Sequence, residues 1–452
     1  MTEMEGYIMR RVSTLCLAAA VVLGVANMSS AVLADGPSYP NDPLFPQQWN
    51  LHNTGQNGGT PGADIHAPEA WNITKCSPNV VIAIADTGVD LTHPDLQGKL
   101  VPGATFIPGT TSAADDNGHG TEMAGIAAAT TDNAQGIASV CPLGKIMPIK
   151  VATGGGHTDD AQGDVQVAAG IRWAVDHGAS VISFSLGVLD TPAMRDAVDY
   201  AYAHNVLIVA AAGNSGNDKS PYPSPVLYPH VLAVGGTDNK DHRTSYSSYG
   251  FPNLVLAPSE SIPTTEKGGG YGHGGYTSIA APQVAGIAGL ILSIRPGLSV
   301  DQLIKVIEQG ADPIDGQTGL TAQNGYGRVN AYKSLLLAQS LVSAAPAVVH
   351  QEAGASASFT VSFNSQAAGS GVVLFGTGPA CRGLVEVAMS DQHPGTTSHT
   401  VVVTGNDLAG TVGDIGLLPG ATYSYKVVTV TRSGTEVNDN GGQCYTVTIP
   451  SR

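Results

Sequence analysis

Charged side chains are scarce in this sequence, and basic ones are the scarcest. Of its 452 residues, 20 are lysine or arginine and 36 are aspartate or glutamate, so charged residues make up 12% and the formal net charge is −16. Proteins bind nucleic acid and anionic membrane surfaces through clustered lysine and arginine. The composition therefore argues against nucleic acid and anionic lipid as partners.

The chain also lacks the composition of a disordered or fibrous protein. Hydrophobic residues make up 42%, close to the value for globular proteins, which argues against intrinsic disorder. The 57 glycines and 28 prolines follow no collagen repeat, so they indicate many tight turns. At about 150 residues per domain, the length allows about three domains.

The N-terminal segment has the pattern of a secretory signal peptide. Arg10 and Arg11 precede the apolar run 14–26, and small residues follow up to Ala34. The alternative is a membrane anchor, but about 13 apolar residues are too few for a bilayer, which needs about 20. We therefore expect cleavage after Ala34 and a secreted, extracellular protein. No later segment is judged long and apolar enough for a membrane span.

Cysteine is rare as well. Cys16 would leave with the signal peptide, and four cysteines would remain: Cys76, Cys141, Cys381 and Cys444. An even number of cysteines in an exported chain suggests two disulfides, for which three pairings are possible. The four cysteines lack the Cys-x-x-Cys spacing of a zinc site.

Two regions differ in their pattern. From about 80 to 335, apolar runs bounded by glycine, proline or asparagine alternate with alanine-rich helical segments, which predicts an α/β domain with a parallel sheet. Active sites of such sheets lie at the carboxyl ends of the strands. Strands are expected at Val80–Ala85, Lys145–Val151, Val181–Ser185, Val206–Ala211 and Val231–Val234, and helices at Gly163–His177 and Thr191–His204.

The C-terminal region has no useful helical period. Residues alternate between polar and apolar in 358–363 and 422–430, and turns with glycine or proline separate the runs, which predicts a β-sandwich. Residues 343–347 have the composition of a short linker. We therefore expect a signal peptide at 1–34, an α/β domain at 35–342 and a smaller all-β sandwich domain at 343–452.

Four motifs contain side chains suited to catalysis. Asp86 ends an expected strand, His119 lies between two glycines, Asn214 follows a strand in a glycine turn, and Ser278 precedes a long apolar helix. Pro282 is tolerated only in the first turn of that helix, so Ser278 is expected at its N-terminus. Each motif alone has a simpler interpretation: a turn aspartate, a surface histidine, a turn asparagine or a helix-capping serine.

Together, the four motifs occur in the order Asp, His, Asn, Ser, which contains the triad order of subtilisin. The chain resembles subtilisin-like serine proteases of the thermitase-like subgroup from about Pro40 to Ala338. The resemblance rests on these motifs: Pro40–Phe45, Asp86–Asp90, His93–Leu96, Asn117–Gly125, Ser185–Gly187, Ala210–Gly216, Thr277-Ser278 and Gly327–Ala331.

The resemblance assigns a role to each motif residue. Ser278 matches the nucleophile, His119 the general base and Asp86 the carboxylate that orients the histidine. Asn214 matches the oxyanion-hole donor, beside the Ser278 backbone N–H. The residues expected to hold the substrate as an added strand are Ser185, Leu186, Gly187, Ala211, Ala212 and Gly213. The resemblance thus implies a serine endopeptidase of broad specificity that acts on protein or peptide substrates as a monomer.

The resemblance also implies a structural calcium ion near Asp42 and Asp95. Asn133 would supply its side-chain oxygen, and three backbone carbonyls would complete an oxygen set suited to Ca²⁺. On spacing alone, the same residues would form a solvated loop with two unrelated aspartates. The expected carbonyl ligands are Thr130, Gln135 and Ile137.

The disulfide pairing follows from the same resemblance. In this fold the strands that follow Cys76 and Cys141 are parallel neighbours, so their N-terminal ends would lie within bridging reach. The expected disulfides are therefore Cys76–Cys141 and Cys381–Cys444.

The sequence departs from the family pattern at several positions. Tyr276 stands where the family usually has glycine, Gln283 replaces a histidine, and Val188 replaces a second glycine. The folding pro-domain usual in subtilisins is not evident between Ala34 and Pro40. A binding protein with a degenerate protease fold and a peptide ligase are the alternative functions, and the intact four motifs favour the protease.

The C-terminal region resembles a fibronectin type III-like domain. Residues 417–425 resemble a tyrosine corner that leads into a strand. This resemblance implies attachment to a substrate, surface or polymer, and the alternative is a passive stabilising appendage.

Overall fold

The computed structural model describes residues 39–153, 161–217 and 225–340, and in the C-terminal region residues 350–353, 358–377, 396–404, 422–431, 434–438 and 444–448. The predicted signal peptide, the linker 343–347 and Cys381 lie outside the described residues. The predicted domain boundaries stay predictions.

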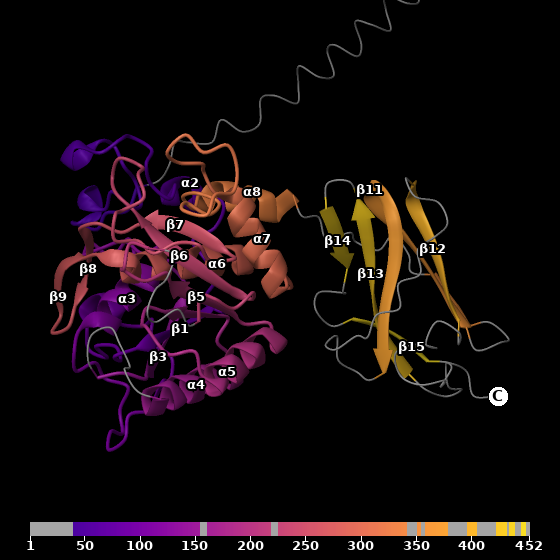
Figure 1. Ribbon diagram of the computed structural model, residues 1–452, viewed down its shortest axis with the longest axis horizontal. Coiled ribbons are helices and arrows are strands. Elements are labelled where there is room, and N and C mark those ends of the chain that lie inside the picture. Colours follow the sequence, from indigo (N-terminus) through magenta and orange to yellow (C-terminus); the bar gives the residue numbers. More distant parts are fainter. Residues whose placement is uncertain are drawn as a thin grey trace, which may run out of the picture. The chain divides into compact units, whose positions relative to one another are not determined.

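A seven-stranded parallel sheet forms the centre of the α/β region (Figure 1). Its order is β2-β3-β1-β4-β5-β6-β7, and the strands are almost entirely buried because both faces are covered. The five expected strands are confirmed, while β2 and β7 were not expected. The strands are β1 Val81–Asp86, β2 Ala104–Thr105, β3 Lys145–Lys150, β4 Val181–Phe184, β5 Leu207–Ala211, β6 Val231–Thr237 and β7 Leu254–Pro258.

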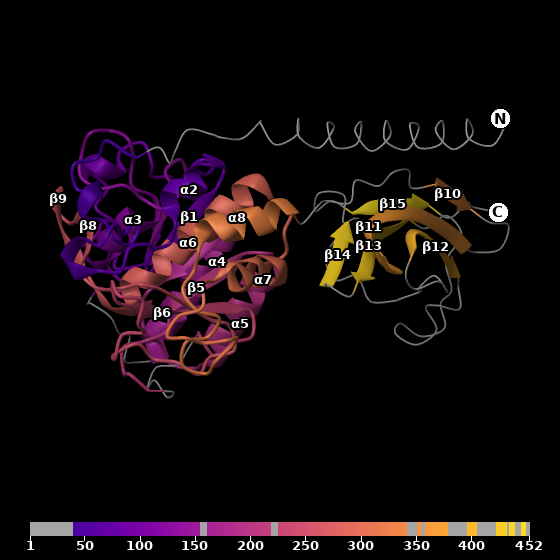
Figure 2. The same cartoon turned by 90° about the horizontal axis from the view of Figure 1, so that it is seen from above.

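Helices cover both faces of the sheet (Figure 2). One core cluster packs α3 (His119–Ala128) and α6 (Tyr276–Ile294) on one face, and the other packs α4 (Ala161–Asp176) and α5 (Pro192–Ala203) on the opposite face. The remaining elements are α2 Ala67–Trp71, α7 Val300–Gly310, α8 Ala331–Ser340, the 3₁₀ turns Phe45–Gln47, Gln56–Gly58 and Pro94–Leu96, and the hairpin β8 Ile262–Glu266 with β9 Gly270–Gly274.

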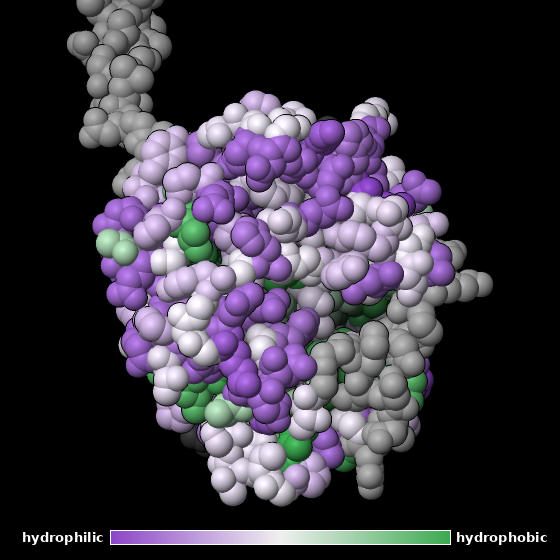
Figure 3. Space-filling view, turned by 90° about the vertical axis from the view of Figure 1, so that its left-hand side faces the viewer, coloured by the Kyte–Doolittle hydropathy of each residue, from purple (hydrophilic) through white to green (hydrophobic). Residues whose placement is uncertain are grey.

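Figure 3 shows the side of this region that carries the hairpin β8–β9. The described side chains on that side are mostly hydrophilic, and the hydrophobic ones form small separate groups. Such a surface is ordinary for a protein that keeps its large apolar residues in the core.

Helix α6 corrects two expectations. It starts at Tyr276, so Pro282 lies inside the helix and not in its first turn. In addition, α6 has 19 residues and is long and apolar enough to cross a membrane by length and composition. The sequence analysis expected no such segment after the signal peptide. The helix is apolar because it lies in the core: 78% of its most apolar stretch is buried inside the protein.

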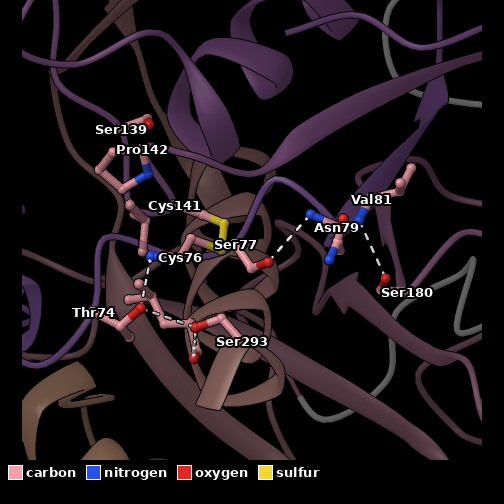
Figure 4. Close-up of a disulfide and its surroundings, with 12 residues drawn as sticks. Thr74, Cys76, Ser77, Asn79, Val81, Ser139, Cys141, Pro142, Ser180 and Ser293 are labelled. Atoms are coloured by element: carbon pink, nitrogen blue, oxygen red, sulfur yellow. Dashed lines mark hydrogen bonds between the residues drawn. A yellow bond between two sulfur atoms is a disulfide. The ribbon is translucent and has the colours of Figure 1, made fainter. Parts of the chain in front are cut away.

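The Cys76–Cys141 disulfide is present, with the two Cα atoms 5.2 Å apart (Figure 4). The expected reason is confirmed: β1 and β3 are parallel neighbours, and Val81 is paired with Lys145 just after the two cysteines. Cys444 is disulfide-bonded too, but its expected partner lies outside the described residues, so that pairing stays a prediction.

The C-terminal region is an antiparallel sheet, which agrees with an all-β region. The long strand β11 pairs with β10 and β12 along its first part and with β13 along its second part, and the register shifts between Asn364 and Gly369. The two expected alternating segments lie in β11 and β13. The strands are β10 His350–Ala353, β11 Ser358–Thr377, β12 Thr396–Thr404, β13 Thr422–Thr431, β14 Gly434–Asn438 and β15 Tyr445–Thr448.

Consecutive residues near the start of β13 are buried, Ser424 included. Tyr423, Tyr425 and Val427 are buried there, and the rings of Tyr425 and Tyr445 stack with their centroids 5.4 Å apart. The predicted tyrosine corner begins outside the described residues, and the fibronectin type III-like identity is not confirmed.

Candidate active site

Asp86 and His119 form a hydrogen-bonded pair at the carboxyl end of the sheet. Asp86 is the last residue of β1, and its side chain is only 1% exposed. His119 is the first residue of α3, and its Nδ1 lies 2.8 Å from Asp86 Oδ1. The same oxygen accepts a bond from the Thr87 N–H at 2.7 Å. The aspartate thus fixes the orientation of the ring, and Nε2 is the nitrogen left for acid–base chemistry.

The surroundings favour the protonated form of His119. Burial alone would lower its pKa, but the negative charge and hydrogen bond of Asp86 outweigh this and raise the pKa to about 9. The carboxylates of Glu122 and Asp115 act in the same direction. The site is therefore built to stabilise an imidazolium, which is the form that a general base reaches when it has taken a proton.

Asp115 ties the end of β1 to the start of α3, and sequence reasoning missed it. Its Oδ1 accepts bonds from the Thr87 hydroxyl at 2.9 Å and from the backbone N–H groups of Asn117 and Gly118. Its Oδ2 accepts from the N–H and hydroxyl of Thr121. A carboxylate shortly before a glycine-flanked helix start is the sequence signal that could have revealed this capping role.

Thr87 completes this connection from the other side. Its hydroxyl oxygen accepts the N–H of Gly120 at 2.9 Å, so one side chain joins Asp115, β1 and α3. Gly120 must be glycine, because a Cβ there would lie 2.0 Å from the Gly88 carbonyl oxygen. This close approach brings His119 to Asp86.

Lys150 is a second residue that the sequence analysis did not single out. It is paired with Asp86 across β1 and β3, and its side chain is buried. Its Nζ donates to the Thr87 carbonyl at 2.6 Å and to Asp116 Oδ1 at 2.7 Å. The lysine therefore supports both loops that lead to the Asp86–His119 pair.

Ser278 is the third residue of α6, and its contacts explain the proline inside this helix. Pro282 has no N–H, so it cannot bond the carbonyl four residues earlier, which belongs to Ser278. That carbonyl accepts the Ser185 hydroxyl at 2.9 Å instead. The Ser278 hydroxyl in turn donates to the Ser185 carbonyl at 3.4 Å. The proline thus frees the group that ties the α6 start to the end of β4.

Within the described part of the chain, no hydrogen bond joins the Ser278 hydroxyl to His119. Catalytic hydrogen bonds are often long or misaligned in a free enzyme and tighten when substrate binds. To reach the imidazole, the Ser278 hydroxyl would have to leave the Ser185 carbonyl.

Asn214 is fixed by its oxygen to the residue next to Ser278. Its Oδ1 accepts the backbone N–H of Thr277 at 3.0 Å and the Thr277 hydroxyl at 2.8 Å. Among the described residues its amide nitrogen has no hydrogen-bond partner, and the side chain is exposed. The donor end is therefore available to a negatively charged oxygen beside Ser278.

The expected substrate-strand residues follow neighbouring parallel strands. Ser185 comes directly after β4, and Ala211 ends β5, which is paired with β4. The Gly213 N–H donates to the Thr277 hydroxyl at 3.1 Å, and its carbonyl accepts from Ser248. The Ala212 N–H donates to Val234. Some backbone groups of the segment 211–213, which was expected to pair with the substrate, are therefore already hydrogen-bonded within the protein.

The expected calcium ligands gather around one loop. Asp42 and Asp95 are 2% and 0% exposed, and burial raises the pKa of both carboxyl groups. Asp42 accepts the backbone N–H groups of Asp132 and Asn133, and Asp95 accepts that of Ile137 at 3.1 Å.

Asn133 is turned differently from its expected role. Its amide nitrogen donates to Asp95 at 2.8 Å, and its oxygen accepts the Gln135 N–H at 2.9 Å. Thr130 donates its backbone N–H to the Asp95 carbonyl, and its hydroxyl oxygen is buried without a partner. The buried carboxylates and the orphaned Thr130 hydroxyl oxygen are donor types that suit a hard cation, and the Asn133 amide would have to turn over to present its oxygen.

Two of the departures from the family pattern are accommodated in the core. The amide nitrogen of Gln283 donates to the carbonyls of Pro258 and Ile279, and its oxygen accepts from Asn50 at 3.3 Å. Val188 is fully buried among apolar residues. Neither substitution leaves a buried polar group of its own unpaired.

Comparison with known proteins agrees with this geometry. Residues 77–327 match the Subtilase family. The chain is 41% identical over 297 residues to thermitase from Thermoactinomyces vulgaris, covering 66% of this chain and 99% of thermitase. It is 39% identical over 324 residues to a thermophilic serine proteinase from Bacillus sp. (strain AK1), covering 70% and 77%.

A solved protease structure from Pseudoalteromonas arctica PAMC 21717 has the same fold. The TM-score is 0.58 at 25% identity, over 67% of this chain and all of that one. The parallel sheet, the Asp86–His119 pair and these matches lead to one conclusion: the chain belongs to the subtilase family and is a serine-type endopeptidase.

Proposed function

We propose that this protein is a secreted endopeptidase in which Ser278 attacks the peptide carbonyl. His119 takes the hydroxyl proton as general base and gives it to the leaving amine as general acid, while Asp86 holds the ring and stabilises the imidazolium. Water then attacks the acyl-enzyme ester, His119 again takes the proton, and the acid product and free Ser278 are released.

The link between Asn214 and Thr277 is the observation that best supports this proposal. Because the Asn214 oxygen is held by the residue next to Ser278, its amide lies beside the carbonyl that Ser278 would attack. The start of α6 adds free N–H groups and a positive dipole end to the same place. A negative oxygen that forms there would meet donors already in position.

The test is covalent labelling with a fluorophosphonate together with casein hydrolysis. We expect Ser278→Ala to lose labelling and to lose hydrolysis by about 10⁶-fold. Ser293→Ala is the matched control, because it is the same substitution in the same helix and removes hydroxyl contacts with Thr74 and with the Leu290 carbonyl, both outside the candidate site. Unchanged labelling of Ser278→Ala would refute the assignment of the nucleophile.

Substrate pairing through backbone groups supports a broad specificity. We assign this role to the segments 185–187 and 211–213, which flank Ser278 and Asn214 at neighbouring strand ends. Backbone hydrogen bonds depend little on the side chains of the substrate, so many proteins and peptides would be accepted.

We assign a structural calcium ion to the loop of Asp42 and Asp95. The two buried carboxylates support this assignment, because each raises the cost of the other's charge and a cation would remove it. Asn133, Thr130, Gln135 and Ile137 would supply the neutral oxygens. The ion would stabilise the fold and takes no part in the chemistry assigned to Ser278.

The N-terminal sequence pattern supports secretion, with cleavage after Ala34. We assign to the C-terminal sheet a role in attachment to a substrate, surface or polymer, and to the whole chain a monomeric state. Sedimentation of the purified enzyme with insoluble protein substrates, after inactivation by fluorophosphonate, would test the attachment.

A further inference from the structure

Tyr276 has a backbone conformation that is unusual for its side chain. It is the first residue of α6, two residues before Ser278, and its φ is +65°. Glycine adopts this left-handed region freely, while a bulky side chain rarely does. A tyrosine therefore occupies a position where the backbone favours the glycine usual in this family.

The neighbouring Tyr246 holds Tyr276 in this conformation. The two rings meet edge to face, with centroids 4.9 Å apart and planes at 61°. The Tyr246 hydroxyl donates to the Ser259 carbonyl at 2.9 Å, which anchors the ring against which Tyr276 packs. Unfavourable backbone conformations persist where several contacts determine them, and they concentrate at functional sites.

The ring of Tyr276 nevertheless stays open to solvent, with 58% of the residue exposed. It lies beside the Asn214 turn, because the carbonyl of Tyr246 accepts the Gly216 N–H at 2.7 Å. Its chain neighbour Thr277 is bonded to Asn214 itself. A peptide whose carbonyl reaches both Ser278 and Asn214 must therefore pass close to this ring.

We propose that Tyr276 contacts the substrate and selects an aromatic or large aliphatic side chain next to the scissile bond. This inference rests on the proposed function of Ser278 and Asn214. An exposed aromatic face binds apolar and aromatic groups, and a ring already held at its edge loses little freedom on binding. The backbone-paired segments would accept most sequences, and Tyr276 would add a preference at one position.

The test is a set of internally quenched peptides with one cleavage site, in which the residue on either side is Phe, Leu, Ala or Asp. Tyr276→Phe keeps the ring, whereas Tyr276→Gly and Tyr276→Asn remove it and suit the left-handed backbone. We expect Tyr276→Phe to keep the preference for Phe and Leu over Ala in kcat/KM. The other two variants should reduce that preference by about three- to tenfold.

Several measurements distinguish a failure of this inference from a failure of the proposed function. Fluorophosphonate titration of every variant gives the concentration of reactive Ser278, and thermal unfolding shows that each variant is folded. Tyr332→Asn, an exposed tyrosine on α8, is the control that should change no preference. If the native protein is not labelled, the proposed function fails. If labelling is intact and Tyr276→Gly keeps the preference, or speeds all peptides equally, the selection by Tyr276 is refuted.

Discussion

Two pairs of buried carboxylates have different surroundings in this protein. In the candidate active site, Asp86 Oδ1 lies 2.8 Å from Nδ1 of His119, and Asp115 accepts bonds at one oxygen from the loop before α3 and at the other from Thr121 in the first turn of α3. Asp42 and Asp95 instead accept hydrogen bonds from neutral groups of the loop that follows α3. The first pair has a partner that becomes a cation, and the second has neutral donors and a neighbouring carboxylate.

The difference shows which groups offset the cost of burying negatively charged carboxylates at each site. Burial and the charge of Asp42 raise the pKa of Asp95, so folding favours its protonated form and its ionisation lowers stability as pH rises past the unfolded value. His119 supplies the missing positive charge in the active site, and a bound cation would do so in the loop. The comparison therefore predicts different results for neutralising an aspartate in each pair.

The largest effect is expected at Asp86. Asp86→Asn keeps the size of the side chain but can hold the wrong ring tautomer of His119, so kcat should fall by about 10⁴-fold. Peptide hydrolysis with active-site titration measures this. A loss below tenfold would show that Asp86 does not orient the base.

A smaller loss is expected at Asp115, which touches the backbone around His119 and not the ring. Asp115→Asn places an amide N–H against existing donors, so His119 should be misplaced and kcat should fall about 10- to 100-fold, with KM little changed. Asp116→Asn is the comparison, because that half-exposed side chain reaches the site only through Lys150, so its loss should be smaller than that of Asp115→Asn. Equal losses in the two variants would contradict the positioning role of Asp115.

Chelation should affect the second pair. Calcium at about a hundredfold excess over its Kd should stabilise the native protein by about 3 kcal/mol, which a chelator would remove. With chelator present, Asp95→Asn should lose the repulsion of Asp42, so its deficit against the native protein should shrink. Thermal unfolding with calcium and with chelator measures both effects.

The control for this loop is Asp132→Asn, because Asp132 is exposed and paired with Lys75 at 2.9 Å. It should respond to calcium like the native protein. An unmoved midpoint of the native protein on chelation, with no metal in the purified protein, would remove the calcium proposal and leave the catalytic assignments intact.

The sequence was sufficient for five of the seven strands of the parallel sheet and for the positions of the four motifs, because each motif follows a buried apolar run or precedes an apolar helix. The catalytic roles of these motifs stay predictions. It did not reveal Asp115 or Thr87, since their contacts join residues 28 positions apart and depend on the meeting of β1 with α3. The hairpin β8–β9 also escaped notice, because its second strand, Gly270–Gly274, contains three glycines and has the composition of a loop.

Tyr276 and Pro282 show a different limit of sequence reasoning. Both residues are visible in the sequence, Tyr276 as a departure from the family pattern and Pro282 as a proline near a helix start, but their meaning depends on the structure: a positive φ in one case and a carbonyl released to Ser185 in the other. Proline was placed in the first helical turn by a general preference, and the tertiary contact with Ser185 outweighed that preference.

The smallest predicted effect concerns the pH dependence of the active-site pair. His119 must be neutral to take the Ser278 proton, and its pKa is raised to about 9, so kcat/KM should rise with pH until about pH 9. Glu122 lies one turn after His119 on α3 and contributes to that rise, so Glu122→Gln should move the rising limb to lower pH. The stability given by charged His119 is complete below its ordinary value of about 6.5 and is lost as pH rises through about 9. Native and variant profiles of kcat/KM, with Glu266→Gln on the neighbouring hairpin as a control, measure the shift. A limb that stays in place in Glu122→Gln would show that Glu122 does not help to set the charge of His119.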